Sequence, residues 1–169
     1  MGGVADVYFS LGSNLGKREI NLENALLELG EIGQIIQRSS IYETSAWGNA
    51  ELNDFLNMAI RFKSRSSASE LLKKIKMIES KMGRNLSKIS TNRQSNYQNR
   101  LIDIDILYYG DKVIDNEALS VPHPRLHLRR FVLEPLREIA PKYIHPLLKK
   151  STDELLEDCP DLNKVKLHS

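Results

Sequence analysis

The segment from Arg100 to Gly110, RLIDIDILYYG, constrains the fold more than any other part of the chain. Isoleucine and tyrosine favour strands and glycine favours a strand end, so the segment predicts a β-strand. Because side chains alternate across a strand, we expect Asp103 and Asp105 on one face, roughly 7 Å apart. The neighbouring isoleucines then occupy the other face. The segment therefore predicts a strand with an apolar core face and an acidic face.

The acidic face has two interpretations. Two carboxylates this close repel each other and raise each other's pKa unless a cation lies between them. A hard divalent cation fits this role, because Mg²⁺ typically takes one or two carboxylates together with substrate phosphates. The alternative is an antiparallel strand with one solvated polar face. Aspartate is disfavoured in strands, so a pair of them requires an explanation that the spacing alone does not supply.

Composition limits the class of protein. The chain has 169 residues, 41% of them hydrophobic and 27% charged, as expected for one globular domain spanning 1–169. A net charge of +2 provides no overall field for nucleic acid. A single cysteine, Cys159, excludes an intrachain disulfide and fits a reducing cytoplasm. The sequence shows no signal peptide and no apolar run long enough to span a membrane, so we expect a cytoplasmic protein without a membrane or nucleic-acid partner.

Hydrophobic periodicity and turn residues divide the rest of the chain into short elements. A Ser-x-x-Glu capping box predicts the start of a helix at Ser67, and a second one predicts a short helix at Ser151. The expected strands are 4–10, 34–42, 55–62 and the edge strand 165–167, and the expected helices are 19–29, 67–82 and 128–139, the last interrupted by Pro135.

Basic residues gather in two places, 84–100 and 125–130. The first holds a long loop, 85–98, that contains almost no apolar residues. Its cations, next to the acidic strand, suggest a polyanion held between them and a metal; a solvated loop is the alternative. His123 is fixed between two prolines. It is a candidate hydrogen-bond donor to a phosphate group, or a structural residue.

Two further stretches carry candidate binding residues. Phe55 and Asn57 share one face of their strand, where a ring could stack on a flat ligand and the amide could recognise its donors and acceptors. Ordinary core packing with a solvated amide is the alternative. The Gly12-Ser-Asn turn could hold a phosphate, but it lacks P-loop spacing and fits a plain strand-to-helix turn.

Taken together, the motifs resemble the 6-hydroxymethyl-7,8-dihydropterin pyrophosphokinase family, from Tyr8 to about Pro141. The motifs that carry the resemblance are Tyr8-Phe-Ser-Leu-Gly-Ser-Asn14, Tyr42-Glu-Thr44, Phe55-Leu-Asn57, Glu79 with Gly83-Arg84, Arg100-Leu-Ile-Asp103-Ile-Asp105, Val121-Pro-His123-Pro and Arg129-Arg-Phe131-Val-Leu-Glu-Pro-Leu136.

The resemblance implies a ferredoxin-like α+β fold, with a mainly antiparallel sheet and helices on both faces in three layers. It also implies an enzyme of folate biosynthesis that transfers the diphosphate of ATP to the hydroxymethyl group of the dihydropterin, releasing AMP. ATP is then a co-substrate, and two Mg²⁺ ions are expected. Both substrates are small molecules.

The resemblance also implies roles for individual residues. The implied catalytic residues are Arg84, Arg100, Asp103 and Asp105, with Asp103 and Asp105 as the metal ligands. The implied ATP-binding residues are Leu72, Glu79, Arg84, Arg100, Ile106, Ser120, His123 and Arg129. The implied pterin-binding residues are Thr44, Ser45, Trp47, Phe55, Asn57 and Phe131.

The chain departs from the family pattern in places. Tyr97-Gln-Asn-Arg100 replaces a frequent Trp-Gly-Pro-Arg run, so Lys88 or Arg93 could supply the second loop cation. Phe55 keeps the stacking of a frequent tyrosine without its hydroxyl, and Ala118 replaces an arginine found in some members. Two other functions remain open at this point. One is a ferredoxin-like module that binds single-stranded RNA, which the acidic pair disfavours, and the other is a metal-dependent phosphohydrolase.

Overall fold

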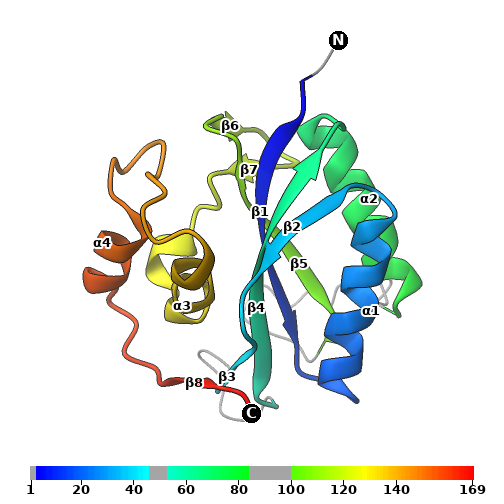
Figure 1. The fold of residues 1–169 in the computed structure, drawn as a ribbon, viewed down its shortest axis with the longest axis horizontal. Coiled ribbons are helices and arrows are strands. Elements are labelled where there is room, and N and C mark those ends of the chain that lie inside the picture. The colour runs from blue at the N-terminus through cyan, green and yellow to red at the C-terminus, as the bar shows by residue number, and fades with distance from the viewer. Residues whose placement is uncertain (1–2, 46–52, 84–99) are drawn as a thin grey trace.

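The computed structural model describes residues 3–45, 53–83 and 100–169, which form both strands and helices (Figure 1). The strands are β1 (Ala5–Ser13), β2 (Gln34–Arg38), β3 (Tyr42–Thr44), β4 (Phe55–Ser64), β5 (Asp103–Tyr109), β6 (Ile114–Asp115), β7 (Ser120–Val121) and β8 (Val165–Leu167). The helices are α1 (Arg18–Gly30), α2 (Ala68–Lys81), the short 3₁₀ helix η2 (Leu126–Leu128), α3 (Arg130–Ile139) and α4 (Thr152–Glu157).

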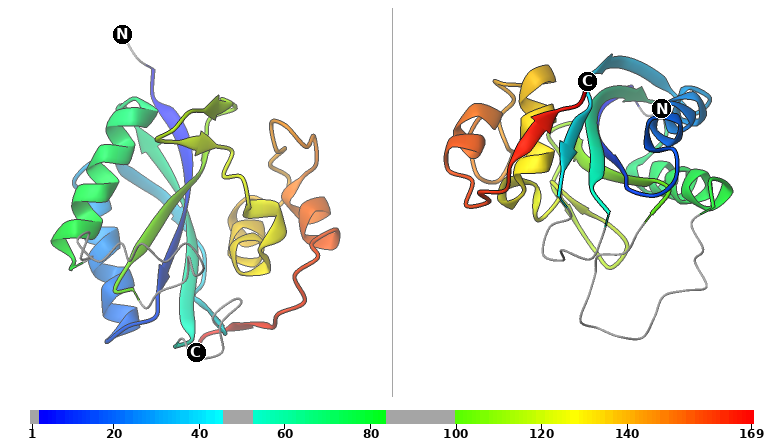
Figure 2. Two further views of the ribbon diagram at one scale, coloured as in Figure 1. Left: turned by 180° about the vertical axis from the view of Figure 1, so that it is seen from behind. Right: turned by 90° about the horizontal axis from the view of Figure 1, so that it is seen from below.

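Six of these strands form one antiparallel sheet in the order β5-β1-β4-β3-β8, with β2 also pairing with β4. The helices α1 and α2 cover one face of the sheet, and α3 and α4 cover the other (Figures 1 and 2). This is the expected α+β architecture with three layers. The strands β1 and β4 lie at its centre, so β5 and β3 are brought to either side of them.

Each face of the sheet has its own apolar core. Residues from β1, β4 and β5 pack with the buried side chains of α1 and α2 in one core, which includes Ile102, Ile104 and Ile106. The other core lies beneath α3 and α4 and includes Leu107 and Tyr108. The predicted alternation of the acidic strand is therefore confirmed up to Ile106, where a register shift against β1 follows.

Both predicted capping boxes are present. The Ser67 hydroxyl accepts a hydrogen bond from the Glu70 backbone N–H, and the Glu70 carboxylate accepts one from the Ser67 backbone N–H. Ser151 and Glu154 form the same reciprocal pair at the start of α4. These ends follow from local chemistry, because each pair satisfies two backbone N–H groups that have no partner inside the helix.

Three predicted boundaries are wrong. The strand β1 continues to Ser13 rather than ending near Ser10, because pairing with β4 and β5 on both sides holds its glycine in the sheet. The predicted strand 34–42 is divided into β2 and β3. The helix α3 runs through Pro135 without interruption. Burial of its apolar face stabilises α3 and outweighs the backbone hydrogen bond that proline cannot donate.

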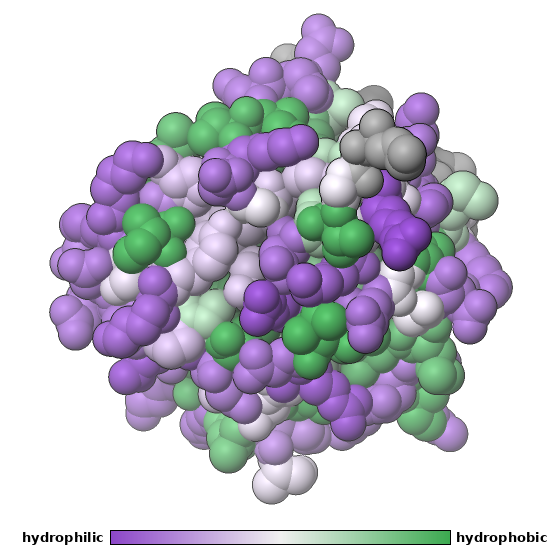
Figure 3. Space-filling view, turned by 45° about the horizontal axis from the view of Figure 1, so that its top comes forward, coloured by the Kyte–Doolittle hydropathy of each residue, from purple (hydrophilic) through white to green (hydrophobic). Residues whose placement is uncertain are grey.

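The surface is mixed. On the face drawn in Figure 3, hydrophobic residues form several separate patches among hydrophilic ones, as is usual for a globular domain. None of the helices in the described residues has the length and apolar character needed to cross a bilayer.

Candidate functional site

The floor of the site is a row of residues that runs across three strands. Asp103 of β5 lies opposite Gly12 of β1, and Gly12 lies opposite Asn57 of β4. A Cβ atom on Gly12 would lie 3.2 Å from the Asn57 Oδ1 atom and 3.5 Å from a ring carbon of Phe55. The absence of a side chain on Gly12 therefore leaves a hollow between a carboxylate and an amide.

This hollow belongs to a cavity of about 220 Å³ on the α3 side of the sheet. Phe131, near the start of α3, and Arg129, just before it, form part of its wall. The complete lining in the described residues is Ser10, Gly12, Thr44, Ser45, Phe55, Asn57, Arg100, Asp103, Asp105, His123, Arg125, Arg129 and Phe131. One part of the lining is charged, and the other combines two aromatic rings with small polar side chains.

The charged part contains the acidic pair and three arginines, Arg100, Arg125 and Arg129. The Arg100 Nη1 atom lies 3.0 Å from the Asp103 Oδ1 atom. Burial and then the neighbouring charge of Asp103 raise the pKa of Asp105 to about 7, against the opposing effect of Arg129. Burial disfavours the ionised form of Asp105, and a cation close to the carboxylate would stabilise that form.

His123 enters the cavity uncharged at neutral pH. Burial and then the positive charge of Arg129 lower the pKa of His123 to about 4. The His123 Nδ1 atom accepts a hydrogen bond from the Arg125 backbone N–H at 3.1 Å. The neutral ring therefore carries its proton on Nε2, which is left as a hydrogen-bond donor. A neutral donor of this kind can bind a phosphate oxygen without adding charge.

Arg125 lines the cavity but was not among the predicted site residues. The basic run 125–130 was recognised in the sequence, yet nothing in it distinguishes the arginines that face the cavity. The Arg125 side chain is exposed, and among the described residues it has no carboxylate partner. Its charge is therefore free to interact with an anion in the cavity.

The remaining lining suits a flat, polar ring. Asn57 is buried, and its Nδ2 atom donates to the Thr44 Oγ1 atom at 2.9 Å. This bond orients the amide so that Oδ1 faces Gly12. Phe55 begins β4 beside the amide, and Phe131 comes from α3. Two aromatic rings and an oriented amide can stack on a heterocycle and recognise its edge.

Asn14 explains the Gly-Ser-Asn motif as a structural device. Its side chain accepts a hydrogen bond from the Arg100 backbone N–H at 2.6 Å and donates one to the Asn53 backbone carbonyl at 3.1 Å. Arg100 and Asn53 are the first residues described after the two gaps, 84–99 and 46–52. Asn14 therefore holds together two segments that are distant in sequence and that both lead into the cavity.

Four predicted ATP-binding residues lie outside the cavity lining. Glu79 is 3% exposed, and its Oε1 atom accepts a hydrogen bond from the Ile104 backbone N–H at 2.9 Å. Ile106 lies in the core beneath α1 and α2, and Leu72 packs against that core. The Ser120 hydroxyl donates to the carboxylate of a β6 residue. The predicted residues Trp47, Arg84, Lys88 and Arg93 lie outside the described residues.

The side chains of the site offer few ligands to a metal ion. Among the described residues, no group of three or more His, Cys, Asp or Glu side chains could enclose a metal ion. The site offers two carboxylates, Asp103 and Asp105, beside an open cavity. This fits Mg²⁺, which keeps several ligand positions for water and substrate phosphates, and it does not fit an ion held only by protein.

Comparison with known proteins adds three findings. Residues 8–141 match the model of the family described as 7,8-dihydro-6-hydroxymethylpterin-pyrophosphokinase. The chain is 40% identical over 151 residues to the 2-amino-4-hydroxy-6-hydroxymethyldihydropteridine pyrophosphokinase of Aquifex aeolicus, covering 89% of this chain and 90% of that one. It is 38% identical over 149 residues to the Bacillus subtilis protein of the same name, covering 87% and 85%.

Two larger proteins are also similar. A folic acid synthesis protein of Dictyostelium discoideum is 38% identical over 155 residues, which make up 92% of this chain and 22% of that protein. The crystal structure of Plasmodium falciparum HPPK-DHPS superposes with a TM-score of 0.72 at 17% identity. It covers 94% of this chain, which spans 45% of the Plasmodium chain. At this identity the superposition shows the fold alone.

Proposed function

The chain belongs to the 7,8-dihydro-6-hydroxymethylpterin-pyrophosphokinase family, and we propose that its cavity holds the two substrates of that reaction side by side. The chain transfers the pyrophosphoryl group of ATP to 6-hydroxymethyl-7,8-dihydropterin, a step in folate biosynthesis. The observation that carries the proposal is the division of one cavity into a charged part and an aromatic, amide-containing part.

The pterin is assigned to the aromatic part. Phe55 and Phe131 supply faces for stacking, and the Asn57 amide, oriented by Thr44, supplies hydrogen bonds to the edge of the ring. The hollow above Gly12 provides space beside the amide. Ser45 completes this part of the lining. The assignment of Trp47 rests on the family resemblance.

The triphosphate is assigned to the charged part. Arg100 and Arg129 supply charge, and the His123 Nε2–H supplies a neutral donor. Arg84 is assigned to the same task by the family resemblance. For adenosine, the assignment of Leu72, Glu79, Ile106 and Ser120 rests on the resemblance alone, since these side chains lie outside the cavity lining.

Asp103 and Asp105 are proposed to hold two Mg²⁺ ions between protein and phosphate. The raised pKa of Asp105 supports this, because a cation would stabilise its ionised form. When bound, Mg²⁺ would neutralise charge on the phosphate oxygens. The Arg100 guanidinium, which pairs with Asp103 in this structure, would then become available to phosphate.

The protein's own contribution is positioning and charge. In the reaction, the pterin hydroxymethyl oxygen forms a bond to the β-phosphorus, and the bond from that phosphorus to the α-phosphate oxygen breaks, releasing AMP. Arg100 and Arg129 stabilise the negative charge that spreads over the transferred group. Because the pterin and the triphosphate are assigned to one cavity on a rigid sheet, the attacking oxygen would be held near its target.

The test is AMP formation from ATP and 6-hydroxymethyl-7,8-dihydropterin with Mg²⁺. The Asp105→Ala variant should lose at least about 10²-fold in turnover while folding normally, since it removes charge stabilisation in the transition state. Asp111→Ala, which removes an exposed carboxylate, serves as the matched control and should retain full activity. Normal turnover by Asp105→Ala would contradict the metal assignment. ATP loss without a pterin acceptor would instead indicate a phosphohydrolase.

We further propose that residues 1–169 act as one pyrophosphokinase domain on small molecules in the cytoplasm. Elements from both ends of the chain share a single sheet, with β1 at its centre and β8 at its edge. Filter binding with single-stranded RNA at moderate salt tests whether the basic segments also bind nucleic acid, and retention of RNA would contradict this proposal.

A further inference from the structure

We propose that residues 161–167, here called the C-terminal strap, position the two walls of the pterin slot and thereby set the affinity for the pterin. The inference rests on the proposed assignment of the pterin to the aromatic part of the cavity. The strap lies beyond the segment 8–141 that matches the family model, and it does not line the cavity. It acts through residues that do.

The slot has two walls from separate elements. Thr44, Phe55 and Asn57 form the sheet wall on β3 and β4, and Phe131 forms the helix wall near the start of α3. A helix can shift on a sheet by small sliding movements, so the width of the slot depends on what joins the two walls. At the far end of α3, the Glu138 carboxylate accepts hydrogen bonds from Ser40 and Tyr42. The strap provides the corresponding connection near Phe131.

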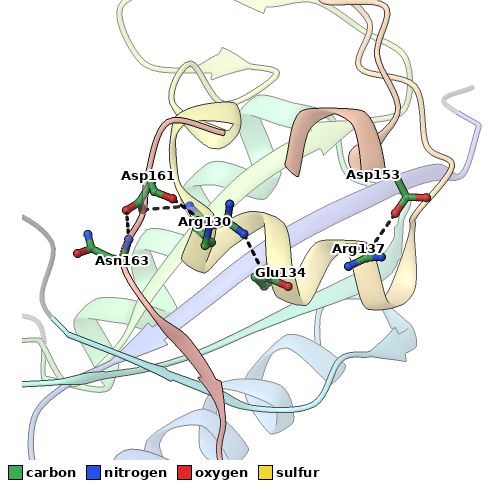
Figure 4. A network of polar contacts seen from close by, with 6 residues as sticks. All are labelled: Arg130, Glu134, Arg137, Asp153, Asp161 and Asn163. Atoms are coloured by element: carbon green, nitrogen blue, oxygen red, sulfur yellow. Dashed lines mark hydrogen bonds and ion pairs between the residues drawn. The ribbon is translucent and has the colours of Figure 1, made fainter. Parts of the chain in front are cut away.

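One end of the strap caps α3. The Asp161 Oδ2 atom accepts a hydrogen bond from the Arg130 backbone N–H at 3.1 Å, and the Asp161 carbonyl accepts one from the Arg130 Nε atom at 2.9 Å (Figure 4). Asp161 is 6% exposed. The N-cap residue of α3, Arg129, makes no side-chain capping bond. The Asp161 carboxylate therefore caps α3 at Arg130, the residue directly before Phe131.

The other end of the strap is a strand of the sheet. The strand β8 pairs with β3, with Val165 opposite Thr44, and the two lie side by side in Figure 2. Just beyond the strap, the His168 backbone N–H donates to the Ile41 carbonyl at 2.9 Å. The His168 Nε2 atom also lies 2.9 Å from Glu19 Oε1 on α1. The strap is therefore anchored to the strand that supplies Thr44.

The link between the two ends is short. Three residues lie between Asp161 and Val165. The two are therefore four Cα–Cα steps apart, and a fully extended chain of that length spans at most about 14 Å. The Asn163 backbone N–H donates to the Asp161 Oδ1 atom at 3.0 Å, which fixes the chain as it leaves the cap (Figure 4). A short, fixed connector between α3 and β3 limits how far the two walls can separate. Loosening either end should widen the slot.

The experiment loosens each end in the full-length enzyme. Asp161→Ala removes the cap and Val165→Pro disrupts the β3–β8 pairing, and each should raise the pterin KM by about ten-fold, with the KM for ATP changed by less than about two-fold. Asp161→Asn keeps one acceptor oxygen and should fall between Asp161→Ala and the wild type. The matched controls are Asp158→Ala, which removes an exposed carboxylate from the same tail, and Val165→Thr, which keeps a β-branched residue and its N–H.

Several outcomes would overturn the inference. A pterin KM that stays at the wild-type value in Asp161→Ala and Val165→Pro shows that the strap does not act on the slot. Equal changes in both KM values, or a loss of kcat that follows a loss of thermal stability, show a general structural role. If Asp161→Ala does not fold, Val165→Pro carries the test, because β8 is a short edge strand.

A direct contact variant separates this inference from the proposed function. Asn57→Ala is measured beside the strap variants by titration with the pterin. Loss of pterin binding in Asn57→Ala with normal binding in the strap variants overturns the strap alone. Normal pterin binding in Asn57→Ala overturns the slot assignment and the strap with it. Weakened pterin binding in Asn57→Ala and in both strap variants supports both.

Discussion

Replacing Asp105 with asparagine should make the substrate-free chain more stable while removing its activity. Burial and the charge of Asp103 raise the pKa of Asp105 from its ordinary value of 3.8 to about 7. A carboxyl group whose pKa is higher in the folded state than in the unfolded state binds its proton more tightly when folded. Ionising it therefore lowers the free energy of unfolding, and an uncharged amide of the same shape removes this penalty.

The difference between the two pKa values corresponds to about 4 kcal/mol at full ionisation, at 1.36 kcal/mol for each pH unit. Because the titrations of Asp105 and Asp103 are coupled, we expect the variant to gain about half of this free energy of unfolding or more. For a domain of this size each kcal/mol shifts Tm by roughly 2–4 °C, so Tm should rise by roughly 5 °C or more.

The pH dependence is the sharper part of the prediction. Below about pH 4 the carboxyl group is protonated in both folded and unfolded chains, so the two proteins should differ little. Between about pH 4 and pH 7 the unfolded chain is ionised and the folded chain is protonated, so the advantage of the variant should grow. Above about pH 7 the stability advantage of the variant over the wild type should be constant.

The assay is thermal unfolding by circular dichroism from acidic to mildly alkaline pH, with chelator and without nucleotide. Asp111→Asn removes an exposed carboxylate and should change Tm by little at any pH. Adding Mg²⁺ and a non-hydrolysable ATP analogue should stabilise the wild type much more than Asp105→Asn. An Asp105→Asn variant with the wild-type Tm at alkaline pH would show that the carboxylate is not destabilising, and the argument from burial would be refuted.

Three other changes test particular contacts. Gly12→Ala should raise the pterin KM by about ten-fold, because its Cβ fills the hollow beside the amide; Gly30→Ala, with open space around its Cβ, is the control in the same steady-state assay. Arg125→Gln should raise the KM for ATP several-fold at low salt and less at high salt, whereas Arg65→Gln, at an exposed bend after β4, should leave it unchanged. Glu79→Ala should lower the free energy of unfolding by about 1–3 kcal/mol in urea, because it leaves a buried backbone N–H of β5 unpaired; unchanged stability would contradict that role.

Local sequence patterns predicted several features of the fold. The two-residue period of β5 predicted that Asp103 and Asp105 lie on one face of the strand and Ile104 and Ile106 on the other, as the structure shows. The capping boxes placed the starts of α2 and α4. These features depend on neighbours within a few residues, so the chain sequence is sufficient to predict them. The extent of β1 and the continuity of α3 through Pro135 were not predictable in this way, because packing against distant elements decided them.

The site follows the same division. Its charged and aromatic side chains were recognisable as residue types in the order of a family pattern, and ten of those predicted line one cavity. That Ser10, Gly12 and Arg125 also line the cavity was not recognisable, because it depends on which residues of other strands and loops lie beside them.

The sequence by itself determined the chemistry of this protein: an acidic pair on one strand, cations near it, and an amide with aromatic rings elsewhere. Only the tertiary structure decided how those groups meet. Strand register set Asp103, Gly12 and Asn57 in one row, burial raised the pKa of Asp105, and the strap joined α3 to β3. The physical reason is that register, burial and contacts between distant segments depend on the whole folded chain, whereas side-chain alternation and capping depend only on near neighbours.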